Sequence, residues 1–446
     1  MLNRFFRGAG RLSLLGAILM AGLIMASQVQ AGNTTSEDAE ADKSGVSEQK
    51  RGIPRWNNPG SIVNRIRRDG EERKDYLFQF PGVDWALQPW FELKADLDEK
   101  HGFRYGISFS TLYQKVASDT IGSKDEAAGY DLDIIAVWTP LGRGTGTETT
   151  FGFEFLKRDT VITELAPAFL FTQYGSLYPS AAPYGETDAS IGELWIQQRF
   201  RNVFGFRVGK IFPITAYDFF PFKNFRKDFI DFNHVTNAAI PLPSNGLGAY
   251  VMYRPHPKFM LRLGAHDANA DVEKAFYNTY EDGEIFKIFE VGYDTGFIPR
   301  EPGRAPHGHV HVSIWHQNER DDAGIDNGWG IAGSALQRFG RFTPWVRYGY
   351  ANQNDDGPTP VKHMANVGLV INEIFGQAYD RIGIGYTWSD PANHRLNQQS
   401  TIDSFYRVQL TPEIQFGPTF QVIIDPVRNP EEDTIYVWGI RGRIAL

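Results

Sequence analysis

The sequence predicts an all-β fold, a transmembrane antiparallel up-and-down β-barrel of about sixteen strands. From residue 103 onward, segments of about nine to twelve residues alternate apolar and polar side chains with a period of two. The apolar rows carry aromatic residues near the segment ends, as at Trp138, Tyr253 and Trp438. The polar rows are rich in glycine and charged residues. The apolar rows are therefore expected to face hydrocarbon and the polar rows an aqueous lumen.

Composition narrows the class of protein further. The chain has 446 residues, 45 glycines, no cysteine and a formal net charge of −8. The missing cysteine excludes a lipoprotein and a disulfide framework. The acidic balance argues against a nucleic-acid partner. The sequence contains neither a Gly-x-Ser-x-Gly nor a His-Glu-x-x-His motif, and we expect no cofactor.

Residues 1–31 have the pattern of a secretory signal peptide. Arg4, Arg7 and Arg11 precede the apolar run LSLLGAILMAGLIM, and Val29 and Ala31 occupy the −3 and −1 positions of a cleavage site. The competing interpretation is a retained membrane helix, but the run is shorter than the roughly 20 residues that a bilayer requires. Cleavage is therefore the prediction.

Residues 32–89 are expected to lie outside the barrel. The polar, acidic stretch 32–52 has no periodicity and is predicted to be a disordered leader. Residues 53–89 are assigned to a peripheral segment, which could contain one short helix. Residues 90–102 place Trp90, Leu93 and Leu97 at helical spacing before a glycine, which predicts a short amphipathic helix at the start of a pore domain spanning 90–446.

The period-two segments and their connections define a meander. Some connections are tight, such as Gly-Arg-Phe, His-Pro-Lys and Thr-Pro-Glu, whereas 115–129, 211–245, 268–284, 317–327, 352–361 and 389–401 are long. This pattern predicts short turns at one rim and long loops at the other. The predicted strands begin near residues 103, 130, 149, 190, 203, 246, 258, 285, 307, 328, 342, 362, 378, 402, 414 and 434.

The final segment, TIYVWGIRGRIAL, shows the two faces most clearly. Tyr436, Trp438 and Ile440 fall in one row, and Arg441 and Arg443 in the other. A closed barrel can use a strand at this position because the last strand pairs with the first and leaves no edge in the hydrocarbon. The arginines are then expected to face the lumen.

Several stretches resemble the carbohydrate-selective porins of the OprB type. WFELKADLDEKHGFRYG resembles the helix of that family that leads into its first strand, and ELWIQQRF followed by FRVGKIFP resembles its strand pair with an Arg-x-Gly-Lys signature. NAAIPLPSNGLGAYVMYRP, GAHDANAD, YRVQLTPEIQFGPTFQVIIDPVRNP and the closing strand follow in the order of the family. The similarity extends over more than about 300 residues, most of the mature chain.

The resemblance implies an outer-membrane porin of a Gram-negative bacterium that lets carbohydrates diffuse passively. The expected partners are mono- or oligosaccharides and outer-membrane lipid; monomer and homotrimer both stay open. One departure is Leu446, because such barrels usually end in an aromatic residue.

The connection 211–245 is the predicted pore constriction. It is too long for a hairpin, and its seven phenylalanines argue against disorder. Sugars present hydroxyl groups to charged side chains and apolar ring faces to aromatic ones, so a sugar-selective constriction should mix both kinds. The candidate substrate-binding residues of the constriction are Glu193, Arg199, Arg207, Lys210, Asp218, Arg226, Asp267, Asn269, Trp315 and Arg347.

Alternation decides the orientation of these candidates. Glu193, Arg199 and Arg207 fall on the lumen face, whereas Lys210 has the wrong parity and needs either a bulge at Gly209 or a position at the rim. Trp315 points inward if its neighbours face lipid, and it then either stacks on sugars or braces the loop by packing. For each candidate the alternative is a solvated lumen charge without ligand contacts.

His307, His309 and His311 share one face at period two and could hold zinc, but histidines on a wet strand are commoner and no metal is expected. The main functional alternative is a general or anion-preferring diffusion porin, which the many inward arginines allow. An outer-membrane lipid hydrolase is the other alternative, and no motif supports it.

Overall fold

The computed structural model describes residues 60–275, 277–280, 283–295 and 308–446. The predicted signal peptide 1–31, the polar stretch 32–52 and His307 lie outside the described residues.

The described residues form sixteen strands. Their starts agree with the predicted ones to within a few residues, and the largest difference is at β2, which begins at Glu126 rather than near 130. The bounds are β1 Phe103–Val116, β2 Glu126–Leu141, β3 Thr149–Thr160, β4 Thr187–Phe200, β5 Phe204–Ile211, β6 Gly246–Tyr253, β7 Phe259–Asp267, β8 Ile285–Asp294, β9 Gly308–Gln317, β10 Gly328–Gln337, β11 Phe342–Asn352, β12 Val361–Asn372, β13 Arg381–Pro391, β14 Gln399–Gln409, β15 Ile414–Ile424 and β16 Thr434–Ala445.

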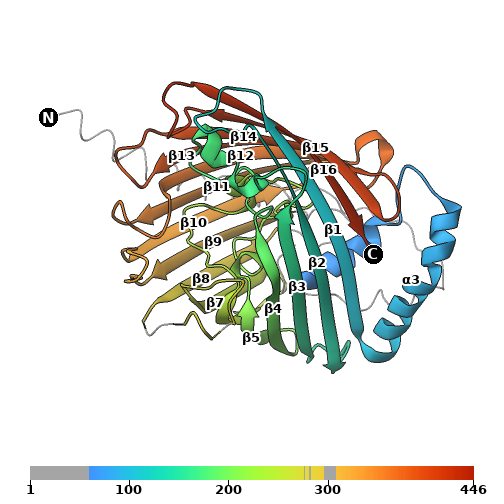
Figure 1. Ribbon diagram of the computed structural model, residues 1–446. Coiled ribbons are helices and arrows are strands. Elements are labelled where there is room, and N and C mark those ends of the chain that lie inside the picture. The colour runs from blue at the N-terminus through green and yellow to red at the C-terminus, as the bar shows by residue number, and fades with distance from the viewer. Residues whose placement is uncertain (1–59, 276, 281–282, 296–307) are drawn as a thin grey trace.

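Each strand pairs antiparallel with its neighbours in sequence, and the sheet closes on itself (Figure 1). The closing pair is β1 with β16, in a register that sets Phe109 opposite Ile444 and Tyr113 opposite Ile440. The predicted all-β, up-and-down barrel is therefore confirmed. Closure leaves no strand edge without a partner.

The two faces of the barrel differ in polarity as predicted. On β16, Tyr436, Trp438 and Ile440 are 39 to 45% exposed on the outside, whereas Arg441 and Arg443 are 3 to 4% exposed on the inside. Phe151 on β3 and Val367 on β12 likewise point outward. An outer surface of this kind is compatible with hydrocarbon rather than with water.

The connections also separate into two rims. Residues 142–148, 201–203, 254–258, 338–341 and 410–413 form short turns at the rim where β1 begins and β16 ends, called here the short-turn rim. At the opposite, long-loop rim, residues 161–186, 212–245 and 268–284 form the longest connections. In outer-membrane barrels the short turns face the periplasm and the long loops the exterior.

The helix predicted over 90–102 is longer than expected. Helix α3, Pro81–His101, begins at Pro81, and Gly102 ends it in the left-handed conformation at φ 65°. Its start was missed because Pro89 lies inside the helix, where proline usually signals a break. The helix lies outside the barrel beside β1 (Figure 1), with the Trp90 and Tyr105 rings 5.1 Å apart.

Within 53–89, the prediction of a peripheral segment is wrong for residues 62–72, whereas residues 81–89 belong to helix α3 outside the barrel. Residues Ile62–Glu72 form helix α2, and its side chains Ile62, Arg65 and Glu72 are buried. This helix lies inside the barrel. In the described part of the chain, no helix has both the length and the apolar character required of a membrane span.

The two-faced barrel predicts a depth-dependent cost for charge on its outer surface. Val367→Arg places a cation near the middle of β12 and should lower the free energy of unfolding in vesicles by about 2–4 kcal/mol. Tyr436→Arg, equally exposed but at the end of β16, should cost about 0–1 kcal/mol. Denaturant titrations followed by tryptophan fluorescence measure both, and equal costs would contradict a hydrocarbon belt.

Candidate functional site in the barrel lumen

Residues 212–245, called here the inner loop, cross the lumen. Arg226 forms ion pairs with Asp131 and Asp133 on β2. Asp218 forms an ion pair with Arg347 on β11. In the barrel, six strands separate β2 from β11 in one direction and eight in the other. The inner loop is thus tied to opposite walls.

Asp218 is bonded to several residues of the barrel wall and of the inner loop. Its carboxylate pairs with Arg347, accepts a hydrogen bond from the backbone N–H of Asn237 at 3.1 Å, and lies 3.3 Å from His311 Nε2. Burial raises the pKa of Asp218, but Arg347 and His311 outweigh burial and hold that pKa well below its usual range. Asp218 is therefore a charged anchor for the loop.

The phenylalanines of the inner loop form a core of their own. Phe220, Phe222 and Phe229 are fully buried and pack on Trp345 of β11. The Phe229 ring also meets Phe405 of β14 edge-on, with centroids 4.8 Å apart. Apolar packing and ion pairs together fix the loop in the lumen, which explains why so long a connection is ordered.

One side of the lumen, formed by strands β4 to β7 together with Tyr217 of the inner loop, combines charged and aromatic side chains. The guanidinium of Arg207 lies 3.7 Å from the centre of the Trp195 ring and donates to Gln197 Oε1 at 2.8 Å. Trp195 Nε1 donates in turn to Glu193 Oε2 at 2.7 Å. This arginine-aromatic wall comprises Glu193, Trp195, Gln197, Arg207, Tyr217, Tyr250 and Arg262.

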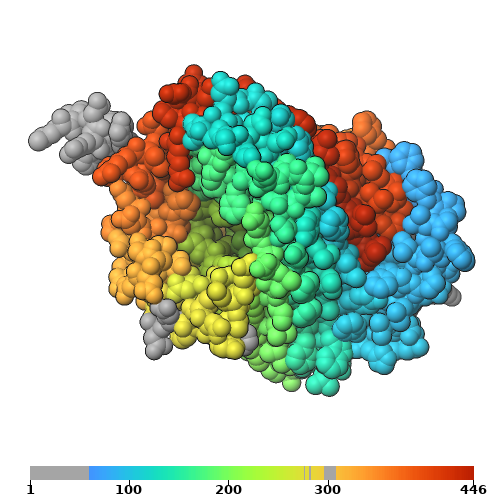
Figure 2. Space-filling view, viewed as in Figure 1, coloured from blue at the N-terminus to red at the C-terminus, as the bar shows by residue number. Residues whose placement is uncertain are grey.

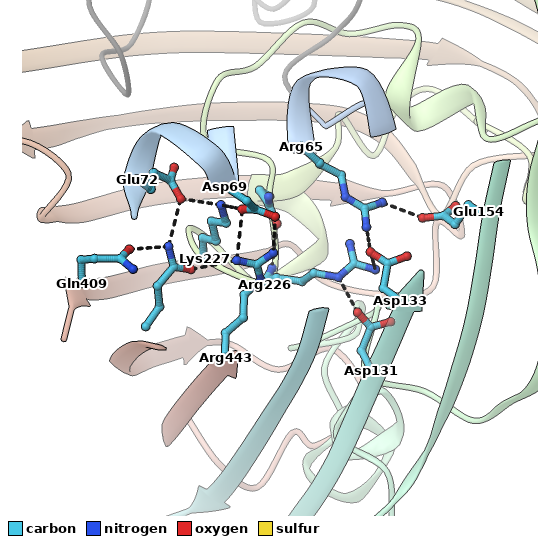
Figure 3. Close-up of polar contacts among 12 residues, drawn as sticks. Arg65, Asp69, Glu72, Asp131, Asp133, Glu154, Arg226, Lys227, Gln409 and Arg443 are labelled. Atoms are coloured by element: carbon cyan, nitrogen blue, oxygen red, sulfur yellow. Dashed lines mark hydrogen bonds and ion pairs between the residues drawn. The ribbon is translucent and has the colours of Figure 1, made fainter. Parts of the chain in front are cut away.

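Helix α2 also lies in the lumen, beside the inner loop. Arg65 forms ion pairs with Asp133 of β2 and with Glu154 of β3, the latter at 2.6 Å. Asp69, one turn further on, and Glu72, almost two turns on, meet cations from the opposite side (Figure 3). Ile62 packs in the same apolar cluster as Trp195 and Tyr250 of the arginine-aromatic wall. This placement could not be predicted from the sequence, because three apolar residues among many charges resemble a surface segment.

A second lumen segment was also missed. Residues 161–186 include Tyr174, Tyr178 and Tyr184, all buried. The Tyr178 ring stacks on Phe232 with centroids 5.9 Å apart, and Tyr184 meets Phe225 edge-on. This segment therefore packs against the inner loop. The sequence feature that could have indicated a buried segment is the group of three tyrosines between two strands.

Four predicted site residues lie at the rims, namely Arg199, Lys210, Asp267 and Asn269. Arg199 pairs with Glu148 near the short-turn rim. Lys210 donates to the carbonyls of Val272 and Lys274, both at 2.8 Å, so it occupies the rim position that its parity required. Gly209 beside it adopts φ 141°, a conformation that favours glycine.

Asp267 and Asn269 organise the next long loop. Asp267 accepts hydrogen bonds from Asn269 N at 2.9 Å and from Thr279 Oγ1 at 2.5 Å. Asn269 Oδ1 accepts a hydrogen bond from Arg320 Nε at 2.6 Å. Both residues therefore shape the mouth of the barrel.

Trp315 points inward, as its parity predicted, and Ile314 beside it is exposed on the outside. Its side chain is 1% exposed and packs in an apolar cluster with Ala332 and Ala351. On the same strand, His309 Nδ1 lies 2.8 Å from Asp294 and His311 faces Asp218. Among the described residues, no three His, Cys, Asp or Glu side chains are grouped so that they could hold a metal ion.

An outer cavity of about 420 Å³ opens at the long-loop rim. Its lining includes Tyr178, Phe232, Ile240, Leu242 and Arg320. Figure 2 shows a hollow between the green, yellow and orange parts of the chain. The cavity is walled mainly by apolar side chains from the inner loop and the segment 161–186, so a solute entering from this rim meets apolar surface first.

Comparison with known proteins identifies a family, a curated relative and solved structures that resemble this chain. A family model described as carbohydrate-selective porin, OprB family, matches residues 142–446, more than half of the chain. Porin AaxA of Chlamydia pneumoniae is 23% identical over 235 residues, which cover 49% of this chain and 50% of that protein. The chain thus spans about half the length of this relative.

The high-pH structure of Pseudomonas putida OprB has a TM-score of 0.63 and 13% identity, and the match covers 80% of this chain and 97% of that one. At this identity the likeness shows the fold alone. Family and fold together indicate a channel in the outer membrane of a Gram-negative bacterium. The chain belongs to the carbohydrate-selective porins of the OprB family.

Proposed function

We propose that the protein lets carbohydrates diffuse passively across the outer membrane, with the inner loop as the constriction and the arginine-aromatic wall as the binding surface. It transports without chemistry. The solute passes from the outer cavity along the inner loop toward the short-turn rim. The observation that carries this proposal is the stacking of Arg207 on Trp195, with Glu193 and Gln197 in the same network.

Sugars suit this combination of groups. Guanidinium and carboxylate groups form directional hydrogen bonds with hydroxyl pairs, and aromatic rings cover the apolar face of a pyranose. The wall supplies both kinds within one network. A channel also needs binding that is weak enough for release, which a few such contacts provide.

A general or anion-preferring pore is the second candidate. The inward arginines Arg381, Arg407, Arg441 and Arg443 favour it. Liposome swelling with solutes of equal size separates the two candidates. A carbohydrate pore admits sugars faster than other neutral solutes, whereas a general pore sorts them by size alone.

Arg207→Gln tests the binding surface. The variant should slow glucose-driven swelling of proteoliposomes roughly tenfold, because a hydrogen bond to a charged group is worth about 1.5–3 kcal/mol. Arg207→Lys keeps the charge but loses the planar fork, and should fall in between. The matched control Lys287→Gln removes a cation from the outer surface and should swell like the wild type. Equal glucose rates in all four proteins would refute the wall as a sugar site.

Asp218→Asn tests the constriction. Breaking a buried ion pair costs about 3–5 kcal/mol, so the inner loop should detach from β11 and the pore should widen. We expect a higher single-channel conductance and entry of larger oligosaccharides. Glu373→Gln removes a carboxylate from an ion pair with Arg338 at the short-turn rim, 2.7 Å apart, and should leave both unchanged. A wild-type size limit in Asp218→Asn would show that the loop does not set the pore width.

A further inference from the structure

Helix α2 places two carboxylates in a strongly cationic part of the lumen. Asp69 accepts from Lys227 at 2.5 Å and from Arg443 Nη2 at 2.7 Å. Glu72 accepts from Lys227 at 2.5 Å, and its other oxygen lies 2.9 Å from Arg407 Nη2. Figure 3 shows Asp69 and Glu72 side by side at Lys227.

The cations come from elements other than α2. We call them the cation cluster: Lys227 of the inner loop, Arg381 of β13, Arg407 of β14 and Arg443 of β16. Each has a side chain no more than 3% exposed.

Without α2, the charges of this cluster are poorly balanced. Asp228 of the inner loop lies 3.6 Å from Arg381 and 3.8 Å from Arg407. Among the described residues, it is the carboxylate outside α2 that forms ion pairs with the cluster. Four cations then face one acid at ion-pair distance, while the charge of Asp380, beside β13, acts on Arg381 and Arg407 from farther away. A buried charge without a counterion costs several kcal/mol, so this part of the lumen needs an anion whenever α2 is absent.

The two carboxylates of α2 are held in their charged form. Burial raises the pKa of Asp69, but Arg443 and Lys227 outweigh it and bring that pKa well below its usual range. The same holds for Glu72, whose pKa Arg407 and Lys227 lower against the effect of burial. The helix thus presents two anions to the cluster.

The contacts that seat α2 are made by side chains. Ion pairs hold its charged face, and Ile62, Val63 and Ile66 pack against the apolar cluster of the wall. An isolated helix of 11 residues is marginal in water, so the helix depends on these contacts. A solute that carries a carboxylate can compete for the same cations.

We propose that the cation cluster is a carboxylate-binding site of the channel, which α2 occupies as an internal ligand. When α2 leaves, the site takes the carboxylate of an acidic sugar, that is, a uronate. The sugar part of this proposal rests on the proposed function, whereas the carboxylate part rests on the ion pairs alone.

The first test removes the internal ligand from the full-length mature chain in planar bilayers. Asp69→Asn combined with Glu72→Gln should raise the single-channel conductance and shift ion selectivity toward chloride. Glucuronate should half-block the current at a concentration at least about tenfold lower than in the wild type, because occupancy by α2 reduces the apparent affinity of the site. Neutral glucose should show no such shift, and acetate tests whether the carboxylate alone suffices.

Glu71→Gln is the matched control for this test. It removes one carboxylate from the same helix, where Glu71 pairs with Arg67 at 2.7 Å, away from the cation cluster. It should behave like the wild type. If the double variant has the conductance, selectivity and glucuronate block of Glu71→Gln, the proposal is overturned. If the double variant lowered the half-blocking concentration of acetate by the same factor as that of glucuronate, the assignment to sugars would be overturned.

A second test keeps both carboxylates and fixes the helix instead. The chain has no cysteine, and a Cβ at Gly106 of β1 would lie 3.8 Å from Ile66 Cγ1, so the two positions are neighbours and the pair Ile66→Cys, Gly106→Cys can be oxidised to fix α2 on β1. Oxidised channels should resist glucuronate at concentrations that block the same channels after reduction. Identical block before and after reduction would contradict a displaceable helix. These outcomes are separate from the swelling assay with neutral sugars, which tests the proposed function.

Discussion

Closure of the sheet in hydrocarbon is the constraint on which the rest of the structure depends. No water is present in the bilayer core to bond a free strand edge, so each backbone group must find a partner within the sheet. The pairing of β1 with β16 provides this, with Phe109 beside Ile444 on the lipid side. Once the ring is closed, side-chain alternation separates an apolar exterior from a polar lumen. The lumen is then the place where charge can gather.

Charge in the lumen is neutralised by segments that enter it. Arg347 of the barrel wall pairs with Asp218 of the inner loop. Asp133 of the barrel wall pairs with Arg226 of the inner loop and with Arg65 of α2. A buried ion pair adds little net stability, because both charges must lose their water. Removing one partner, however, leaves the other charge buried without a counterion. These pairs therefore specify where each segment lies more than they add to stability. On the two proposals above, the ion pairs that narrow the channel also decide which solutes bind to the channel wall, by displacing either water or helix α2.

The strands could be predicted from the sequence because the lipid-facing residues of a strand must be apolar, whereas the residues between them, which face the lumen, can be polar. That rule also gave the correct inward positions of Glu193, Arg207 and Trp315. It could not place α2, because a helix inside a polar lumen needs no continuous apolar face. Nor could it reveal that Asp218 and Arg347 bind each other, since no periodicity connects residues so far apart in sequence. The role of the predicted residues in sugar binding stays a prediction.

The most direct measurement of this arrangement is lipid contact along one strand. Because the chain lacks cysteine, a fluorophore can be attached to Ile440→Cys or to Arg441→Cys on β16. In vesicles of lipids with brominated acyl chains, the label at position 440 should be strongly quenched and the label at 441 should not. Equal quenching at both positions, or the reverse order, would contradict a barrel with hydrocarbon outside and water within.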